Sequence, residues 1–273
     1  MSNKITGKWH GKRYDYEDNE RSTVRALSDS LVSISENYNV VGIKQSFEDE
    51  GAILSDVVTM RRVTELSGLK MYVKIGGCEA ITDINNCVSN SIDAIIAPMI
   101  ETEYAFKKFA TAVKNIKKTD FYFLCETSTA YENIDSILSA DEVGCLAGVI
   151  LGRSDFTKSY DLDKNQVDSG FIGEKVRNVF EKSKKLNLTT TMGGNISVKS
   201  KDFIRSLYND GLLDKIETRN VVVELNEDNV HNLEKTISNI LNYEIEWLKF
   251  KAENYDSISK SYIERIETLQ NRI

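Results

Sequence analysis

Short apolar runs rich in β-branched and aromatic residues alternate along this chain with amphipathic stretches of helical spacing. Seven such runs begin at Val40, Met71, Asp93, Phe121, Gly148, Leu188 and Val221. The runs show no regular apolar–polar alternation, which indicates strands that are buried on both faces. Strands that alternate with helices form parallel sheets. The sequence therefore predicts an α/β protein with a parallel sheet.

The choice between the common parallel architectures rests on one missing motif. A dinucleotide-binding sheet would carry GxGxxG after its first strand, and none follows the run that begins at Val40. We therefore predict a TIM (β/α)8-type barrel, which 273 residues with 41% hydrophobic content can fill. An eighth strand is not obvious. We expect it to be an atypical first strand before residue 20, ahead of a helix over residues 22–37.

The C-terminal part of the chain differs from the rest. No strand signal occurs in residues 229–273, and apolar residues recur there at the spacing of a helix seam. The seam consists of Tyr262, Ile266, Leu269 and Ile273, and earlier apolar positions are Leu233, Ile237, Ile240, Leu241 and Leu248. We predict a barrel over residues 1–228 and an extension of two helices over 229–273. The extension packs either on its own barrel or on a second subunit, and we expect a homo-oligomer.

Charge and composition exclude several classes of partner. The formal net charge of −7 argues against nucleic acid and anionic membranes, which bind basic patches. No apolar stretch approaches the roughly 18 residues of a transmembrane span, and the first residues lack the hydrophobic region of a signal peptide. We therefore expect a cytoplasmic protein. An anionic substrate would need local positive charge or a metal.

Histidine is scarce in this chain. His10 and His231 are the only two, which argues against a Ser-His or Cys-His pair and against a His-rich zinc site. The four cysteines include no CxxC pair and are expected to be free thiols. Catalysis would therefore depend on carboxylates, lysine or arginine, hydroxyl groups and a metal.

Two acidic residues stand where two neighbouring apolar runs end. Glu126 follows the run over 121–125, and Asp155 follows the run over 147–154. In a parallel barrel both side chains would lie at the C-terminal mouth of the strands, which is the active face of such barrels. Mg²⁺ or Mn²⁺ is commonly held by one or two carboxylates, so the pair predicts a metal site. Helix caps or ordinary ion-pair partners are the alternative interpretation.

Four segments within residues 40–200 resemble the HpcH/HpaI aldolase and citrate lyase β-subunit superfamily. They are residues 47–51 (Phe-Glu-Asp-Glu-Gly), 72–76 (Tyr-Val-Lys-Ile-Gly), 125–127 (Cys-Glu-Thr) and 151–157 (Leu-Gly-Arg-Ser-Asp-Phe-Thr). These segments are similar in order and spacing to the Leu-Glu-Asp, Val-Arg, Ile-Glu-Thr and Gly-Pro-Ala-Asp elements of that superfamily. The resemblance implies a phosphoenolpyruvate/pyruvate-type TIM barrel.

The function that the resemblance implies is a divalent-metal-dependent carbon–carbon lyase that acts through a pyruvate-type enolate. Its implied metal ligands are Glu126 and Asp155, with Mg²⁺ or Mn²⁺ as the metal. The implied substrate-binding segment is Gly152, Arg153, Ser154 and Asp155, with backbone amides at Ser154 and Asp155 holding a carboxylate. The implied catalytic residues are Lys74, Glu48 and Asp49. The substrate would be a small anion, either a keto acid or its aldehyde acceptor.

Three residues depart from the superfamily pattern. Lys74 stands in place of the usual Arg, and lysine cannot form the planar two-bond fork to a carboxylate. Asp49 stands where the aldolase branch has a His. Arg153 adds a cation that could meet a second anionic group. Lys74 could also be a solvated rim lysine or a Schiff-base nucleophile.

Two other functions stay open from the sequence. One is an acyl-CoA or phosphoenolpyruvate-using barrel enzyme of the same superfamily. A CoA site would show basic residues for the nucleotide phosphates, and we find no convincing cluster. The other is a non-catalytic barrel with an assembly role, which the presence of both Glu126 and Asp155 disfavours.

Overall fold

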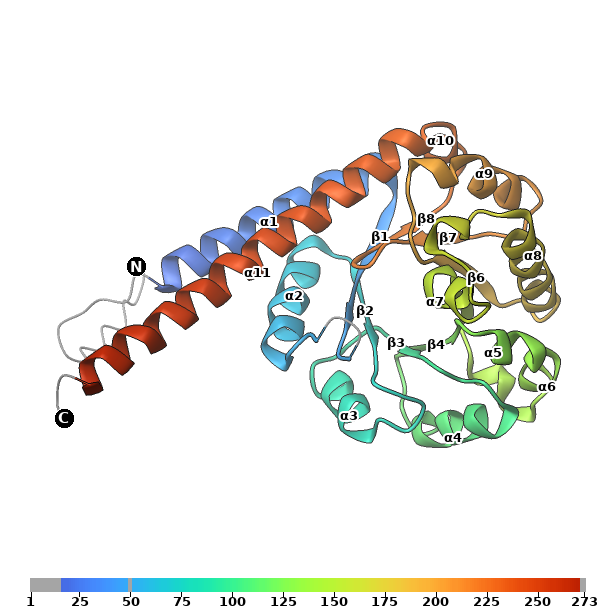
Figure 1. The fold of residues 1–273 in the computed structure, drawn as a ribbon, viewed down its shortest axis with the longest axis horizontal. Coiled ribbons are helices and arrows are strands. Elements are labelled where there is room, and N and C mark those ends of the chain that lie inside the picture. Colours follow the sequence, from blue (N-terminus) through green and yellow to red (C-terminus); the bar gives the residue numbers. More distant parts are fainter. Residues whose placement is uncertain (1–15, 49–50, 271–273) are drawn as a thin grey trace.

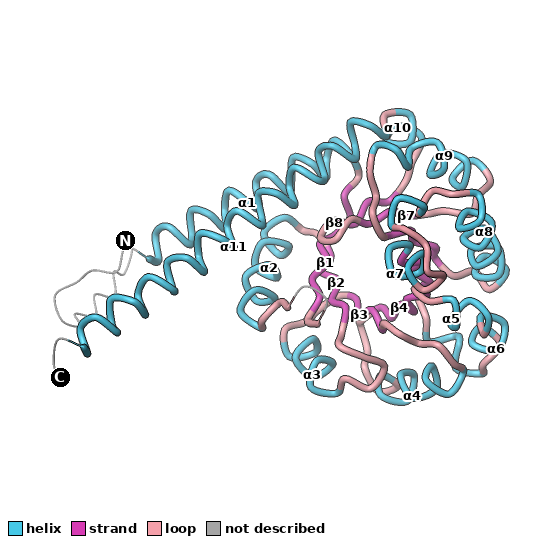
Figure 2. Tube along the Cα trace, in the orientation of Figure 1, coloured by secondary structure: helices cyan, strands magenta, loops and turns pink. Residues whose placement is uncertain are grey.

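Eight strands form a closed barrel in chain order in the computed structural model, which describes residues 16–48 and 51–270 (Figure 2). The strands are β1 Val40–Ser46, β2 Lys70–Lys74, β3 Ala94–Ala97, β4 Asp120–Cys125, β5 Gly148–Gly152, β6 Thr189–Gly193, β7 Lys215–Glu217 and β8 Val221–Glu224. All seven apolar runs identified in the sequence form strands. The predicted TIM-type barrel is therefore confirmed.

Helices surround the barrel and bury an apolar face against it (Figure 1). They are α1 Tyr16–Tyr38, α2 Leu54–Ser67, α3 Ile81–Ser89, α4 Glu103–Val113, α5 Ser128–Glu132, α6 Ile134–Leu138, α7 Arg153–Lys158, α8 Gly170–Lys185, α9 Lys201–Asn209, α10 Glu227–His231 and α11 Leu233–Gln270. Three 3₁₀ turns are η1 Asp141–Cys145, η2 Lys164–Gln166 and η3 Val198–Ser200. Helix α4 shows the pattern: Thr102 caps its first turn, and Phe106, Phe109 and Val113 face the core.

The last strand of the barrel runs in the opposite direction to the others. Strands β1 to β7 pair in parallel, but β8 is antiparallel to both β7 and β1. A tight turn joins β7 to β8, and in it the Val221 amide donates to Thr218 Oγ1 at 3.0 Å. The end of β8 consequently lies at the amino end of the parallel strands. The turn between β7 and β8 lies at their C-terminal mouth.

The expected position of the eighth strand is wrong. Residues 16–20 belong to helix α1, and residues 1–15 lie outside the described residues. The barrel is completed instead by β7, which contains a single apolar residue, Ile216, between Lys215 and Glu217. A strand of three residues with two charges gives no apolar run, which is why the sequence pattern did not reveal it.

Two tyrosines fill the middle of the barrel. Tyr72 and Tyr122 have ring centroids 5.8 Å apart and are almost fully buried. Each ring packs over a glycine of a neighbouring strand, and a Cβ built on Gly42 or Gly148 would lie 2.6 or 2.9 Å from a ring carbon. Burial raises the pKa of Tyr122 to about 12. The interior is thus a packed core.

Helices α1 and α11 lie side by side and form an arm that extends away from the barrel (Figure 1). The first part of α11 has buried side chains that include Ile240 and Trp247. Near its middle, Tyr255 donates to Asp56 of α2 at 2.7 Å, and Lys251 pairs with the same carboxylate at 3.1 Å. From there to Gln270 the side chains are exposed.

The prediction of two helices in the extension is wrong, because α11 is one continuous helix over Leu233–Gln270. Leu233, Ile237 and Ile240 are buried, so this part packs on its own barrel. Seam residues Tyr262, Ile266 and Leu269 are 66%, 53% and 44% exposed, and Ile273 lies outside the described residues. Across the described ranges, no helix has the length and apolarity needed to cross a bilayer.

Candidate functional site

Glu126 and Lys74 lie together at the C-terminal mouth of the barrel. Glu126 directly follows β4, and Lys74 ends β2. Lys74 Nζ lies 3.4 Å from Glu126 Oε2, and the Met99 amide donates to Glu126 Oε1 at 3.2 Å. The Glu126 side chain is only 4% exposed and that of Lys74 14%. Lys74 is therefore not a solvated rim lysine.

The electrostatics of Glu126 reflect its burial. Burial raises the pKa of Glu126 above its ordinary value, while Lys74 and the Met99 amide oppose the shift and the charge of Asp155 adds to it. A buried carboxylate with a second carboxylate in electrostatic range is a place where added positive charge is favourable. The arrangement therefore suits a cation in addition to Lys74.

Asp155 lies in the first turn of α7, with its side chain 44% exposed. It pairs with Lys158 at 3.1 Å. Asp155 and Glu126 contribute oxygen ligands only, and Mg²⁺ or Mn²⁺ usually takes one or two carboxylates and completes its shell with water and substrate. No group of three or more potential metal ligands occurs in residues 16–48 and 51–270. The two carboxylates fit a hard divalent cation of that open kind.

The predicted substrate-binding segment lies beneath the loop after β6. Gly194 has φ +78°, and a Cβ built on it would lie 2.4 Å from Ser154 N and 2.5 Å from Arg153 N. A side chain at this position would clash with the Ser154 amide, to which the family resemblance assigns the binding of a substrate carboxylate. Gly152 lies beside Glu126, because a Cβ built on Gly152 would lie 3.6 Å from Glu126 Oε2.

The structure contradicts the predicted role of the Arg153 side chain. Its side chain is 0% exposed and forms an ion pair with Asp168. It also donates to the Gly193 carbonyl at 3.2 Å and to Ser200 Oγ at 3.4 Å. Burial lowers the pKa of Arg153, and Asp168 opposes that shift. Arg153 therefore links the segment after η2 and the end of η3 to the end of β6, and its charge is already neutralised.

Glu48 lies at the rim of the mouth, where its side chain is exposed. A Cβ built on Gly76 would lie 2.7 Å from Glu48 Cγ, so Glu48 covers the loop after β2. The Gly76 amide in turn donates to Asp83 at 2.8 Å. Asp49 lies outside the described residues. Their predicted catalytic roles stay predictions.

Sequence reasoning missed a second buried ion pair in this mouth. Lys44 of β1 bonds Glu217 at the end of β7, with the two side chains 13% and 5% exposed. The sequence contained one indication of this pair. Lys44 lies two residues after Gly42 in β1, so its side chain lies on the same inner face of the barrel.

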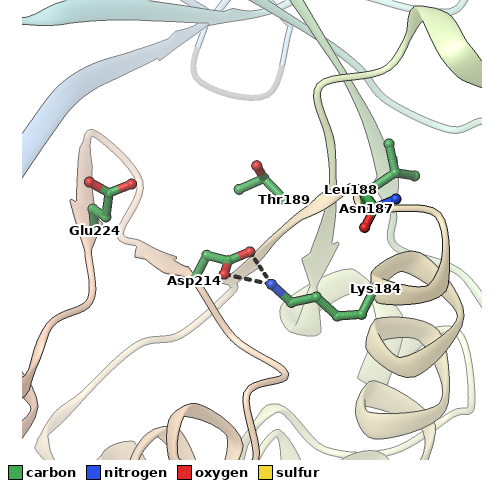
Figure 3. A pocket seen from close by; sticks show the side chains of 6 residues that line it. All are labelled: Lys184, Asn187, Leu188, Thr189, Asp214 and Glu224. Carbon is green, nitrogen blue, oxygen red and sulfur yellow. Dashed lines mark hydrogen bonds and ion pairs between the residues drawn. The ribbon is translucent and has the colours of Figure 1, made fainter.

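One cavity of the described structure lies at the opposite end of the barrel (Figure 3). Its lining comprises Lys184, Asn187, Leu188, Thr189, Asp214 and Glu224. Lys184 bonds both oxygens of Asp214 at 2.5 Å, and the Thr190 amide donates to the same carboxylate at 2.8 Å. These groups satisfy one another, so the cavity is not the predicted active site.

Solved structures share this fold, although neither the protein-family models nor the curated proteins match the sequence. An HpcH/HpaI aldolase/citrate lyase family protein from Burkholderia cenocepacia J2315 matches with TM-score 0.57 and 11% identity, over 80% of this chain and 90% of that one. An HpcH/HpaI aldolase from Desulfitobacterium hafniense DCB-2 matches with TM-score 0.56 and 11% identity, over 70% and 82%.

A third structure is the protein CitE from Mycobacterium tuberculosis in complex with magnesium and acetoacetate. It matches with TM-score 0.50 and 13% identity, over 83% of this chain and 94% of that one. Likeness at these identities shows the fold. This chain therefore shares the barrel fold of these structures, and the chemistry is argued from the site.

Proposed function

We propose that this protein is a divalent-metal-dependent carbon–carbon lyase of the HpcH/HpaI aldolase and citrate lyase type, which forms or cleaves a 2-keto acid. The observation that carries the proposal is the buried Glu126 at the strand ends, with Asp155 in electrostatic range. Buried carboxylates cost folding free energy, so their position at the mouth points to a function. The magnesium of the M. tuberculosis relative supports the same class of cofactor.

Glu126 and Asp155 would hold the cation, Mg²⁺ or Mn²⁺, through their carboxylate oxygens. The chemistry supplied by such a cation is Lewis-acid stabilisation of the negative charge that develops on a pyruvate-type enolate. Lys74 lies beside Glu126 and would provide positive charge for the substrate carboxylate. The Ser154 and Asp155 amides would complete that carboxylate site under the loop of Gly194.

The partners follow from the same proposal. The substrate is a small anion, which an overall acidic protein binds through this local positive charge. We further propose that the exposed part of α11 pairs with a second copy of the chain, because its apolar seam is solvent-exposed. The proposed location is the cytoplasm.

Metal binding is tested by titrating Mn²⁺ calorimetrically into the full chain and into Asp155→Ala. We expect one site that Asp155→Ala abolishes. Asp202→Ala is a matched control, because Asp202 also lies in the first turn of a helix and pairs with a basic residue three positions later. Undiminished binding by Asp155→Ala would contradict the assignment, and equal loss in both variants would point to non-specific binding.

The reaction class is tested with pyruvate in D₂O, where NMR follows exchange of the methyl protons. We expect exchange that requires Mg²⁺ or Mn²⁺ and stops with EDTA, with no adduct after borohydride treatment. A borohydride-trapped mass increase on Lys74 would replace the metal mechanism with a Schiff-base mechanism.

A further inference from the structure

Glu217 is one of three buried acidic residues within residues 23–48 and 51–270. The others are Asp56 and Glu126, and the three are 4%, 6% and 3% exposed. Asp56 lies on α2 and is bound by Tyr255 and Lys251 of α11, which explains it as a structural contact. Glu126 belongs to the proposed metal site. Glu217 is left as a buried carboxylate inside the same mouth.

The position of Glu217 relative to Glu126 follows from two glycines. Gly152 and Gly193 are register partners at the ends of β5 and β6. A Cβ built on Gly152 would lie 3.6 Å from Glu126 Oε2, and one built on Gly193 would lie 2.9 Å from Glu217 Oε1. Neighbouring strands are about 4.8 Å apart, so the two carboxylate oxygens lie within roughly 12 Å of each other.

The mouth therefore contains two lysine–carboxylate pairs over one strip of backbone without side chains. Lys74–Glu126 lies on one side, and Lys44–Glu217 lies on the other. A lysine ammonium donates hydrogen bonds and a carboxylate accepts them, so the second pair is complementary to a hydroxyl, which does both. Tyr72 and Tyr122 lie below this strip in the barrel, and the charge of Glu217 helps to raise the pKa of both side chains.

We propose that Glu217 is the proton-transfer residue of the site and that Lys44 positions it. The inference rests on the proposed lyase function and adds a residue to it. A substrate held at Glu126 and Asp155 would direct its hydroxyl across the glycine strip towards Glu217.

The step balances without another reactant. In the cleavage direction, the Glu217 carboxylate takes the proton of the substrate hydroxyl, and the carbinol C–O bond becomes the aldehyde C=O bond. The adjacent C–C bond breaks, and its electron pair is left on the pyruvate fragment as an enolate. Glu217 then returns its proton to the enolate carbon, which gives pyruvate and restores the carboxylate. Condensation is the reverse sequence.

The test compares pyruvate methyl exchange in D₂O with Mn²⁺ for the full chain, Glu217→Gln and Asp56→Asn. We expect Glu217→Gln to lower the maximal exchange rate at least 100-fold, the usual effect of losing a general base, with KM changed less than about 3-fold. Asp56→Asn is the matched control, since it also removes a buried carboxylate paired with lysine, and its rate should stay within about 2-fold.

Three further variants separate a catalytic loss from a folding defect. Lys44→Gln/Glu217→Gln removes both charges together and should fold and bind pyruvate while exchanging as slowly as Glu217→Gln. Glu217→Ala leaves space, and we expect added formate to restore part of its exchange rate. Lys44→Gln alone should lower the rate about 10-fold at unchanged KM, as expected of a residue that acts through Glu217.

The outcomes separate the two proposals. No exchange by the unaltered protein with either metal would overturn the lyase function and this inference with it. Exchange by the unaltered protein and an equal rate in Glu217→Gln would overturn the inference alone. Joint loss of rate and pyruvate binding in the double variant, with no rescue of Glu217→Ala by formate, would make Lys44–Glu217 a structural pair.

Discussion

Replacing Asp168 with alanine tests whether Arg153 is a structural residue. In the native protein the Arg153 guanidinium is fully buried, and Asp168 is the carboxylate that neutralises it. Asp168→Ala would leave a cation in the interior whose remaining described partners are the Gly193 and Val167 carbonyls and Ser200 Oγ. Neutral groups solvate a guanidinium less well than a carboxylate does.

The expected magnitude follows from this environment. Removing one partner of a buried ion pair costs about 3–5 kcal/mol of unfolding free energy. The Asp168 side chain is 25% exposed, and three neutral acceptors remain for Arg153, so water and these groups recover part of the loss. We therefore expect the lower end of the range, about 3 kcal/mol.

The assay is equilibrium urea unfolding at pH 7, followed by circular dichroism. Asp210→Ala is the matched control, because Asp210 also pairs with an arginine, Arg177, but the two side chains are 50% and 32% exposed. Exposed pairs contribute about 0–1 kcal/mol. A loss below about 1 kcal/mol in Asp168→Ala would refute the reasoning. It would return Arg153 to the role of a substrate-binding cation that the sequence suggested.

Three other perturbations are informative. The free energy of unfolding of Glu126→Gln should rise relative to that of the native chain between pH 4 and pH 8 in EDTA, because the raised pKa of Glu126 in the folded state stabilises the native chain most at low pH. Urea unfolding at both pH values measures this difference, and the opposite trend would contradict the prediction. Lys74→Met should tighten Mn²⁺ binding several-fold and weaken pyruvate binding at least 10-fold, as measured by calorimetry, because it removes a cation 3.4 Å from Glu126. Truncation after Asp256 should change Tm by no more than about 2 °C, because the described side chains beyond that residue are exposed. It should also reduce the number of subunits measured by light scattering, and an unchanged number would locate the interface elsewhere.

The strands were predictable where burial on both faces produced an apolar run. The hairpin of β7 and β8 was not, for two physical reasons. Ile216 alone is too little apolar surface to signal a strand, and the run Val221–Val223 is equally apolar in either direction. Direction depends on the turn at Thr218, whose hydroxyl accepts from the Val221 amide, and on pairing with β1.

The site shows the same division. Glu126 and Asp155 could be placed at the mouth because each follows an apolar strand. The partners of the Arg153 side chain could not be predicted, because Asp168 and Ser200 lie 15 and 47 residues further along the chain. Glu217 could not be recognised as buried before the strand that carries it was known. The environments of Arg153 and Glu217 depend on residues distant in the sequence, which a local sequence pattern does not reveal.

The reversed β8 also determines how the barrel closes during folding. Strand β8 reaches β7 through a short local turn, whereas its other partner, β1, lies near the start of the described chain. Contacts between residues distant in sequence form late, because closing a long loop costs entropy before the contacts form. We expect the β1–β8 edge to join last and to open first in native-state hydrogen exchange, with slower exchange in the parallel pairs β3 to β5. Helices α1 and α11 lie directly before and shortly after the two strands of this edge, so their mutual packing would set the lifetime of the closed barrel.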